Sequence, residues 1–198
     1  MIRLLLVAVL CISSMQVFSE SNDEISTKCL TDFSSEKYKE ALSSCTIAAE
    51  QSNAYAQHVL GFIYYSGQGT TQNYKQAFKW FKLAAEQGIA DAQYNLALMY
   101  NKGQGTTQDY KQAFKWYAFA AEQGVADAQN NLGVMYDNGF GVLQDNIYAH
   151  MWLNVASSNG SLKAPENRDI VAERMSRKQI EKAQKLAREC TAKEYKDC

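Results

Sequence analysis

Apolar residues in the middle of the chain recur at steps of three and four, and glycines interrupt the recurrence at regular places. One stripe consists of Ala56, Leu60, Gly61 and Tyr64, and a second consists of Ala77, Trp80, Phe81, Ala84 and Ala85. Steps of three and four place residues on one face of a helix, so each stripe predicts an amphipathic helix. Between the stripes, Gly67 and Gly69 provide positive φ angles that end a helix and turn the chain, and Gly88 ends the second helix.

This two-helix pattern repeats, and its clearest markers are Trp80, Trp116 and Trp152. Successive markers are 36 residues apart. When residues 54–88 are aligned with residues 90–124, 23 of 35 positions are identical. Residues 126–160 form a third, more diverged copy, and residues 38–51 resemble the second helix of a copy. A fixed period of this length is typical of solenoids and repeat arrays.

The repeat also indicates how these helices are buried. Alanine and glycine let the two helices of a copy approach closely, and the tryptophan is expected to fill the space between them. One helix pair cannot bury both of its faces, so neighbouring copies must stack. The single proline in 198 residues agrees, because β-sandwiches and barrels use proline at edges and turns. We therefore expect an all-α fold.

The first 19 residues have a different pattern from the repeats. Arg3 precedes an apolar run over residues 4–12. Val17 and Ser19 are the small residues at the −3 and −1 positions of a cleavage site after Ser19. This is the pattern of a cleaved secretory signal peptide. The run is too short to span a bilayer, which needs about 20 apolar residues, so a membrane anchor is disfavoured. A lipoprotein cut at Cys11 is disfavoured because Leu10 precedes it. We expect a soluble, exported mature chain with no stable membrane insertion.

Charge and residue spacing argue against three kinds of ligand. The formal net charge is −1, whereas nucleic-acid-binding domains normally have a strong basic excess. No cluster of histidine, cysteine and carboxylate has metal-site spacing, and the Gly-x-Gly turns follow helices rather than strands, unlike phosphate-binding loops. We therefore expect no cofactor, no metal and no nucleic-acid partner.

Four cysteines remain after removal of the signal peptide: Cys29, Cys45, Cys190 and Cys198. An even number in an oxidising compartment predicts disulfides, and three pairings are possible. We favour Cys29–Cys45 with Cys190–Cys198, because each bond closes a short loop. The second bond requires the chain to fold back soon after Cys190, since eight helical residues extend about 12 Å. A zinc site is the less favoured alternative, because the four cysteines contain no C-x-x-C.

The second copy contains Ala90-x-Ala92-Gln93-x-Asn95-Leu96, then Gly103-x-Gly105, then Trp116-Tyr117 and Ala120-Ala121-Glu122-Gln123-Gly124. These residues resemble the Sel-1-like repeat, a variant of the tetratricopeptide repeat. The resemblance implies a right-handed α-solenoid of antiparallel helix pairs with a helical C-terminal cap. It divides the chain into a signal peptide (1–19), a degenerate N-terminal half-repeat or cap (20–53), three repeats (54–89, 90–125 and 126–161) and the C-terminal cap (162–198).

The C-terminal segment also resembles the helical cap of exported family members. Ser176 with Gln179 predicts a capping box that opens a helix. Ile180, Ala183 and Leu186-Ala187 then share one face of that helix.

In tetratricopeptide repeats the first helices line a concave groove that binds extended peptides, and the resemblance implies the same arrangement here. The corresponding positions are Tyr55, His58, Phe62, Tyr65 and Ser66 in copy one; Asp91, Tyr94, Leu98, Asn101 and Lys102 in copy two; and Asp127, Asn130, Val134, Asp137 and Asn138 in copy three. Each set shares one helical face, opposite the apolar stripe. These positions differ most among the copies, whereas the core positions repeat. The alternative is a solvated face that tolerates aromatic residues.

Some cysteine-rich family members are reported to bind or cleave β-lactams, so an envelope hydrolase or cell-wall-binding protein of the β-lactam-recognising kind is the alternative function. Ser34-Ser35-Glu36-Lys37 contains S-x-x-K, but the chain has no K-T-G. Ser34 or Ser35 is better explained as the N-cap of the next helix. The two histidines, His58 and His150, have no expected catalytic partner.

We therefore expect a protein without enzymatic activity that serves as an exported protein–protein interaction module. Its location would be periplasmic or secreted, and its partner a protein or peptide of the bacterial envelope or host.

Overall fold

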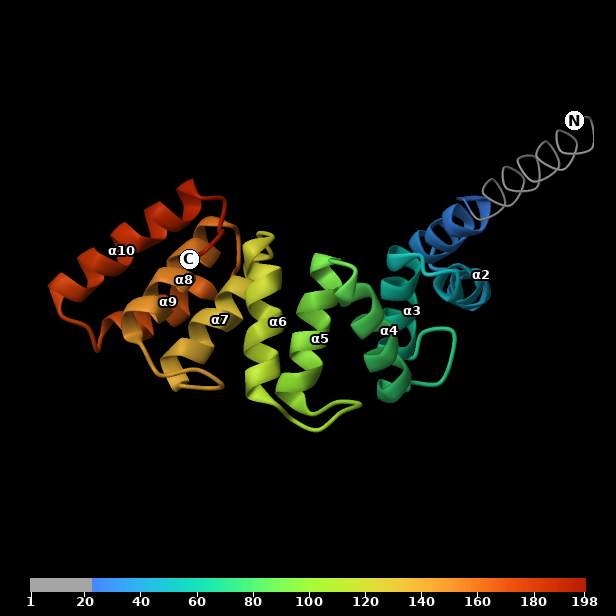
Figure 1. Ribbon diagram of the computed structural model, residues 1–198, viewed down its shortest axis with the longest axis horizontal. Helices are drawn as coiled ribbons and strands as arrows, with labels where there is room; N and C mark the ends of the chain where they lie inside the picture. The colour runs from blue at the N-terminus through green and yellow to red at the C-terminus, as the bar shows by residue number, and fades with distance from the viewer. Residues whose placement is uncertain (1–22) are drawn as a thin grey trace, which may run out of the picture. The chain divides into compact units, whose positions relative to one another are not determined.

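The computed structural model describes residues 23–198 (Figure 1). The predicted signal peptide and its cut after Ser19 lie outside these residues. Within them, all regular secondary structure is α-helical, which confirms the expected all-α class. None of the helices in this part of the chain has both the length and the apolar character required to cross a bilayer.

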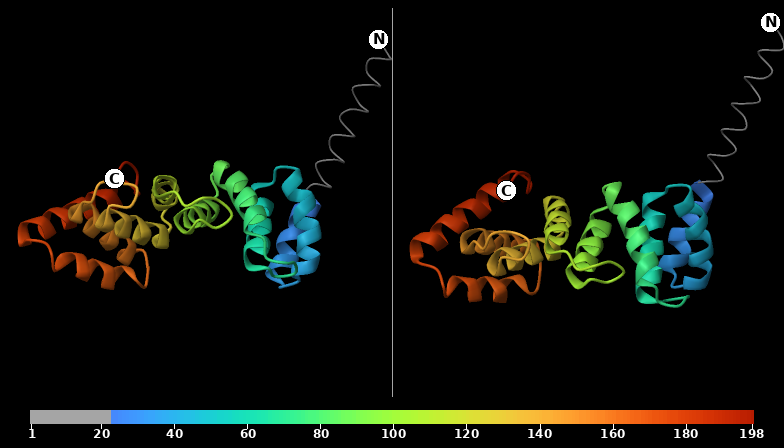
Figure 2. Two further views of the ribbon diagram at one scale, coloured as in Figure 1. Left: turned by 90° about the horizontal axis from the view of Figure 1, so that it is seen from below. Right: turned by 60° about the horizontal axis from the view of Figure 1, so that its bottom comes forward.

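The helices follow one another as antiparallel pairs, the arrangement of an α-solenoid (Figures 1 and 2). They cover residues 23–34, α2 (Tyr38–Glu50), α3 (Ala54–Ser66), α4 (Tyr74–Glu86), α5 (Ala90–Lys102), α6 (Tyr110–Glu122), α7 (Ala126–Asn138), α8 (Asn146–Ser158), α9 (Ala164–Ala172) and α10 (Arg177–Ala192). The chain divides into two compact units, an N-terminal unit up to Ala84 and a C-terminal unit from Ala85 onward.

Glycine ends the first helix of each repeat. Gly67, Gly103 and Gly139 have φ angles of +75°, +66° and +70°. A residue with a Cβ is disfavoured at these left-handed values, so glycine determines where the helix stops. Glycine also allows close packing inside a pair, because a Cβ on Gly61 would lie 2.6 Å from the ring of Phe81.

A buried glutamine from each first helix fixes the end of the preceding helix. The side-chain N–H groups donate to backbone carbonyls eight residues earlier: Gln57 to Ala49 (3.1 Å), Gln93 to Ala85 (3.2 Å) and Gln129 to Ala121 (3.0 Å). The last carbonyls of a helix lack partners within it, so these bonds satisfy acceptors that burial would otherwise leave unpaired.

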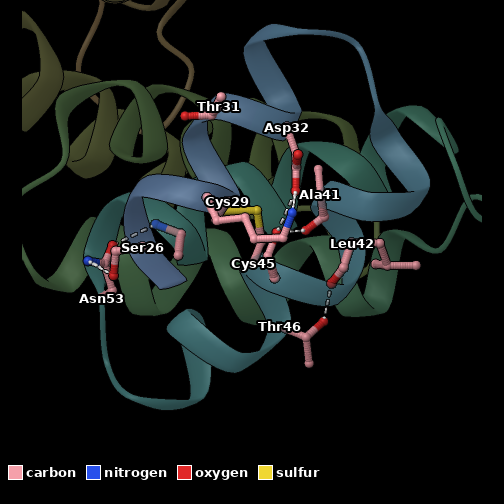
Figure 3. Close-up of a disulfide and its surroundings, with 12 residues drawn as sticks. Ser26, Cys29, Thr31, Asp32, Ala41, Leu42, Cys45, Thr46 and Asn53 are labelled. Atoms are coloured by element: carbon pink, nitrogen blue, oxygen red, sulfur yellow. Dashed lines mark hydrogen bonds and ion pairs between the residues drawn. A yellow bond between two sulfur atoms is a disulfide. The ribbon is translucent and has the colours of Figure 1, made fainter. Parts of the chain in front are cut away.

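The N-terminal unit contains a helix that the repeat pattern did not predict. Residues 23–34 form a helix before α2, so the segment expected to be a half-repeat is a helix pair. Cys29 in this helix is bonded to Cys45 in α2, with a Cα–Cα distance of 4.7 Å, and both cysteines are fully buried (Figure 3). The disulfide therefore joins the two helices of the first pair.

Helices α9 and α10 form the predicted C-terminal cap. Ser176 and Gln179 make the expected capping box at the start of α10. The second disulfide joins Cys190 to Cys198, whose Cα atoms are 5.3 Å apart. Beyond α10 the chain turns back through residues with positive φ angles, including Glu194 at +53° and Tyr195 at +67°.

We call residues 193–198 the hook. Within it, the Tyr195 hydroxyl donates to Asn159 Oδ1 at 2.9 Å. Lys196 Nζ donates to the carbonyl oxygen of Glu122, at the end of α6, at 3.0 Å. The hook thus connects the end of the chain to the ends of α6 and α8.

The three repeated tryptophans are not equally buried. Trp80 is 8% exposed and Trp152 is 4% exposed, as expected for residues that fill space between helices. Trp116 is only partly buried; it lies against the core and meets Phe119 edge-on at 5.5 Å. The expectation of a core position was therefore wrong for Trp116, because equivalent positions in the repeat have different neighbours.

Candidate functional site

In the N-terminal unit, the predicted partner-binding positions on α3 differ in exposure. Tyr55 is 62% exposed and Phe62 is 37% exposed, and Phe33 from residues 23–34 meets Phe62 edge-on at 5.6 Å. His58 and Tyr65 are half-buried, with ring centroids 5.7 and 6.3 Å from that of Phe81. The accessible part of this face is therefore aromatic and consists mainly of Tyr55 and Phe62.

In the C-terminal unit, the predicted positions of α5 are at least partly accessible. Asp91 and Lys102 are exposed, and Tyr94, Leu98 and Asn101 are half-buried. The ring of Tyr94 lies 5.9 Å from that of the buried Tyr117. This contact anchors one edge of Tyr94 while the remainder of its side chain stays accessible.

The cap helix α9 covers part of the predicted positions on α7. Asn130 is only 6% exposed, and its Oδ1 accepts a hydrogen bond from Asn167 Nδ2 at 2.9 Å. Asp137 forms an ion pair with Arg174 at 2.6 Å. Near the start of α7, Asp127 accepts a hydrogen bond from Ser161. Asn130 therefore contributes to the α7–α9 contact more than to an open surface, while Val134 remains half-buried and Asn138 exposed.

Two hollows lie along the predicted partner-binding face of α7. The first, which we call the Tyr94 hollow, has a volume of about 380 Å³ and is lined by Tyr94, Asp127, Asn130, Asn131, Gly160, Leu162 and Lys163. The second, the Leu153 hollow, has a volume of about 160 Å³ and is lined by Val134, Asp137, Asn138, Leu153, Asn167, Ile170 and Val171. The structure thus brings predicted residues of α5 and α7 together with residues of the cap that were not predicted as site residues.

Asn167 and Ile170 lie on α9, outside the three repeats, so the 36-residue period gave no signal for either residue. Ile170 is 50% exposed and stands next to Asp169 on a short polar helix.

The residues that suggested an enzyme do not form a catalytic arrangement in the described chain. Ser34 lies at the end of the helix over residues 23–34, and its hydroxyl donates to the carbonyl of Thr31 at 3.0 Å. The N-cap position of α2 is Lys37, with no side-chain cap, so the expected N-cap role of Ser34 or Ser35 was wrong. No group of three histidine, cysteine or carboxylate side chains suited to a metal ion occurs among residues 23–198.

His150 on α8 is an internal residue. It is 3% exposed, and its Nδ1 is buried without a hydrogen-bond partner among the described residues. Burial lowers the pKa of His150 below its ordinary value, and the positive charge of Arg168 on α9 lowers it further, while Asp169 opposes this effect. The neutral imidazole is therefore the form that suits the folded protein.

We expect this histidine to make folding sensitive to acid. The pKa of His150 is 6.5 when unperturbed and lower in the folded state, so below about pH 6.5 the unfolded chain binds a proton that the folded chain does not. Unfolding free energies from urea titrations should therefore fall between pH 7.5 and 5.5. His150→Gln should reduce this loss, and the control His58→Gln should retain it. An identical loss in His150→Gln would assign the acid sensitivity to other groups.

The family model described as Sel1 repeat matches residues 54–89, 90–125 and 126–161. Among curated proteins, the comparison found no match.

Several solved structures resemble this chain. The crystal structure of c5321, a protective antigen of uropathogenic Escherichia coli strains with an SLR fold, is 37% identical with a TM-score of 0.73. That similarity covers 79% of this chain and 34% of the other, so this chain spans about a third of the length of c5321. A Sel1 repeat protein from Oxalobacter formigenes is 29% identical with a TM-score of 0.64, covering 83% of this chain and 74% of the other.

Cysteine rich protein B of Helicobacter pylori is more distant, with 21% identity and a TM-score of 0.52. The similarity covers 66% of this chain and 93% of the other. At this identity the likeness concerns the fold alone.

Proposed function

Because the chain belongs to the Sel1 repeat family, whose members generally serve as protein-interaction modules, we propose that it binds a protein or peptide partner through the exposed face of its first helices. The observation that carries the proposal is the pair of hollows along α7, lined by predicted residues of α5 and α7. Hollows lined by a few aromatic, apolar and polar side chains are typical of sites that bind side chains of a partner.

The chemistry of the face favours a peptide over a purely apolar ligand. The Tyr94 hollow combines an aromatic ring with carboxamides, the Asp127 carboxylate and the Lys163 ammonium group. Carboxamides both donate and accept hydrogen bonds, which suits the alternating donors and acceptors of a peptide backbone. Leu162, at 95% exposed, adds an apolar side chain at the rim.

The test is a double substitution on α5, Tyr94→Ala with Leu98→Ala. Mature protein would capture partners from a cross-linked envelope extract of the source organism. We expect the double variant to capture at least about 10-fold less partner than the wild type. Central aromatic and apolar contacts contribute most of the binding free energy of an interface. Circular dichroism should show unchanged helicity.

The matched control is Phe119→Ala, which removes a 40%-exposed aromatic residue from the second helix α6. We expect Phe119→Ala to capture as much partner as the wild type. Equal capture by the wild type and the double variant would exclude this face as the binding site.

We also propose that the protein works in the periplasm or outside the cell, as a scaffold rather than an enzyme. Two disulfides support an oxidising compartment. A scaffold role is supported by the surroundings of His150 and Ser34, which tie both residues to local packing and hydrogen bonding.

A further inference from the structure

The Leu153 hollow exists because one repeat position is smaller in copy three. Leu153 is equivalent to Phe81 in copy one and Tyr117 in copy two, at intervals of 36 residues. Both aromatic residues are buried and contact residues of their own first helix: Phe81 lies against His58 and Tyr65, and Tyr117 against Tyr94. Leucine at this position fills less of the space, and the structure has a hollow of about 160 Å³ there.

The interior of the hollow is aliphatic. Leu153 and Val171 are each 1% exposed and form its deepest part, and Val134 and Ile170 stand nearer the surface. An apolar cavity of about 150 Å³ is large enough to hold one benzene-sized group. The volume therefore suits one apolar side chain, not a larger ligand.

The rim of the hollow is polar, and contacts between α7 and α9 hold its side chains in place. Asn167 on α9 donates to Asn130 on α7, and Arg174 on α9 is paired with Asp137 on α7. Asn138 Nδ2 donates to the carbonyl of Val134. These bonds use only part of the hydrogen-bonding capacity of the carboxamides of Asn138 and Asn167. Both side chains line the hollow, and Asn138 is exposed while Asn167 is half-buried.

We propose that the Leu153 hollow is a specificity pocket that takes a leucine-sized aliphatic side chain of an extended peptide, whose backbone passes the carboxamides of Asn138 and Asn167. This inference rests on the proposed function and adds to it the residue type that the partner presents. An apolar interior beside carboxamides selects such a peptide, because a peptide supplies an apolar side chain and two flanking amide groups together.

The test uses a minimal probe, N-acetyl-leucine N-methylamide, which carries one leucine side chain between two amides. It would be titrated into the ¹⁵N-labelled, disulfide-bonded protein and followed by NMR. We expect saturable shifts in the side-chain amides of Asn138 and Asn167 and in the backbone of Ile170. A dissociation constant of roughly 1 mM is expected for so small a ligand. The alanine analogue should bind about 10-fold more weakly, because it buries fewer carbons.

Leu153→Phe is the deciding variant. It places at this position the phenylalanine that copy one has at the equivalent position, Phe81, where the ring packs against a glycine. Gly133 faces Leu153 as Gly61 faces Phe81, so the larger ring should be accommodated. We expect the variant to fold and to lose the saturable shifts. The control Leu143→Phe makes the same change at a position that is 88% exposed and should keep them.

Absence of saturable shifts in the wild type, or unchanged shifts in Leu153→Phe, would overturn the pocket. The substitution of Tyr94 and Leu98 tests the proposed function separately. Partner capture that is lost in that double variant but unaffected by Leu153→Phe would therefore remove the pocket and leave the proposed function standing.

Discussion

Trp152→Ala is expected to lower the free energy of unfolding by about 3–5 kcal/mol, the usual cost of removing a large aromatic side chain from a core. Trp152 is 4% exposed and belongs to the core that also contains Tyr117, Leu132 and Met135. Urea unfolding followed by circular dichroism would measure the loss.

Trp116→Ala is the matched control, since it is the same substitution at the same position of the preceding repeat. Trp116 is partly buried, so its loss should be smaller, about 1–2 kcal/mol, in proportion to the apolar area withdrawn from water. Equal losses at the two positions would mean that the repeats contribute equally and that the difference in exposure has no energetic weight.

Gly141→Ala should destabilise the protein by about 2–5 kcal/mol, through two costs that act together. Gly141 has a φ angle of +72°, where a Cβ costs roughly 1–2 kcal/mol. The added Cβ would also overlap the backbone carbonyl of Tyr110 and lie 2.8 Å from the backbone nitrogen of Lys111, and overpacking of this kind costs about 1–3 kcal/mol.

Gly160→Ala separates these two costs. Gly160 also has a positive φ, +94°, but a Cβ there would meet nothing within 4 Å. Gly160→Ala should therefore lower the free energy of unfolding only by the cost of a Cβ at positive φ, about 1–2 kcal/mol. If the two variants unfold at the same urea concentration, the backbone near Tyr110 moves aside and the close contact carries no cost.

The helix pairs could be predicted because their causes are local and repeated. Glycine at Gly67, Gly103 and Gly139 is required by positive φ, and this requirement leaves a trace at a fixed interval in the sequence. The capping box at Ser176 and Gln179 is likewise a contact between near neighbours. The favoured cysteine pairs also close short loops, and the structure contains both.

The parts of the site that could not be predicted depend on contacts without a repeated signal. Helix α9 is not a copy of the repeat, so the period gave no indication that Asn167 would reach Asn130 or that Arg174 would pair with Asp137. The helix over residues 23–34 likewise lies outside the matched repeats. The replacement of an aromatic residue by Leu153 was visible in the sequence, but its effect depends on how closely α9 approaches.

The hook changes how the C-terminal unit should lose its structure. In a simple solenoid each repeat contacts only its neighbours, so local opening can spread stepwise from an end. Lys196, however, bonds to a carbonyl 74 residues earlier, and the Cys190–Cys198 disulfide holds the loop that presents it. Fraying of α10 is therefore thermodynamically coupled to the end of α6 across the intervening helices. Reduction of this one terminal disulfide should weaken that coupling, so that amide exchange at the end of α6 accelerates along with that of α10.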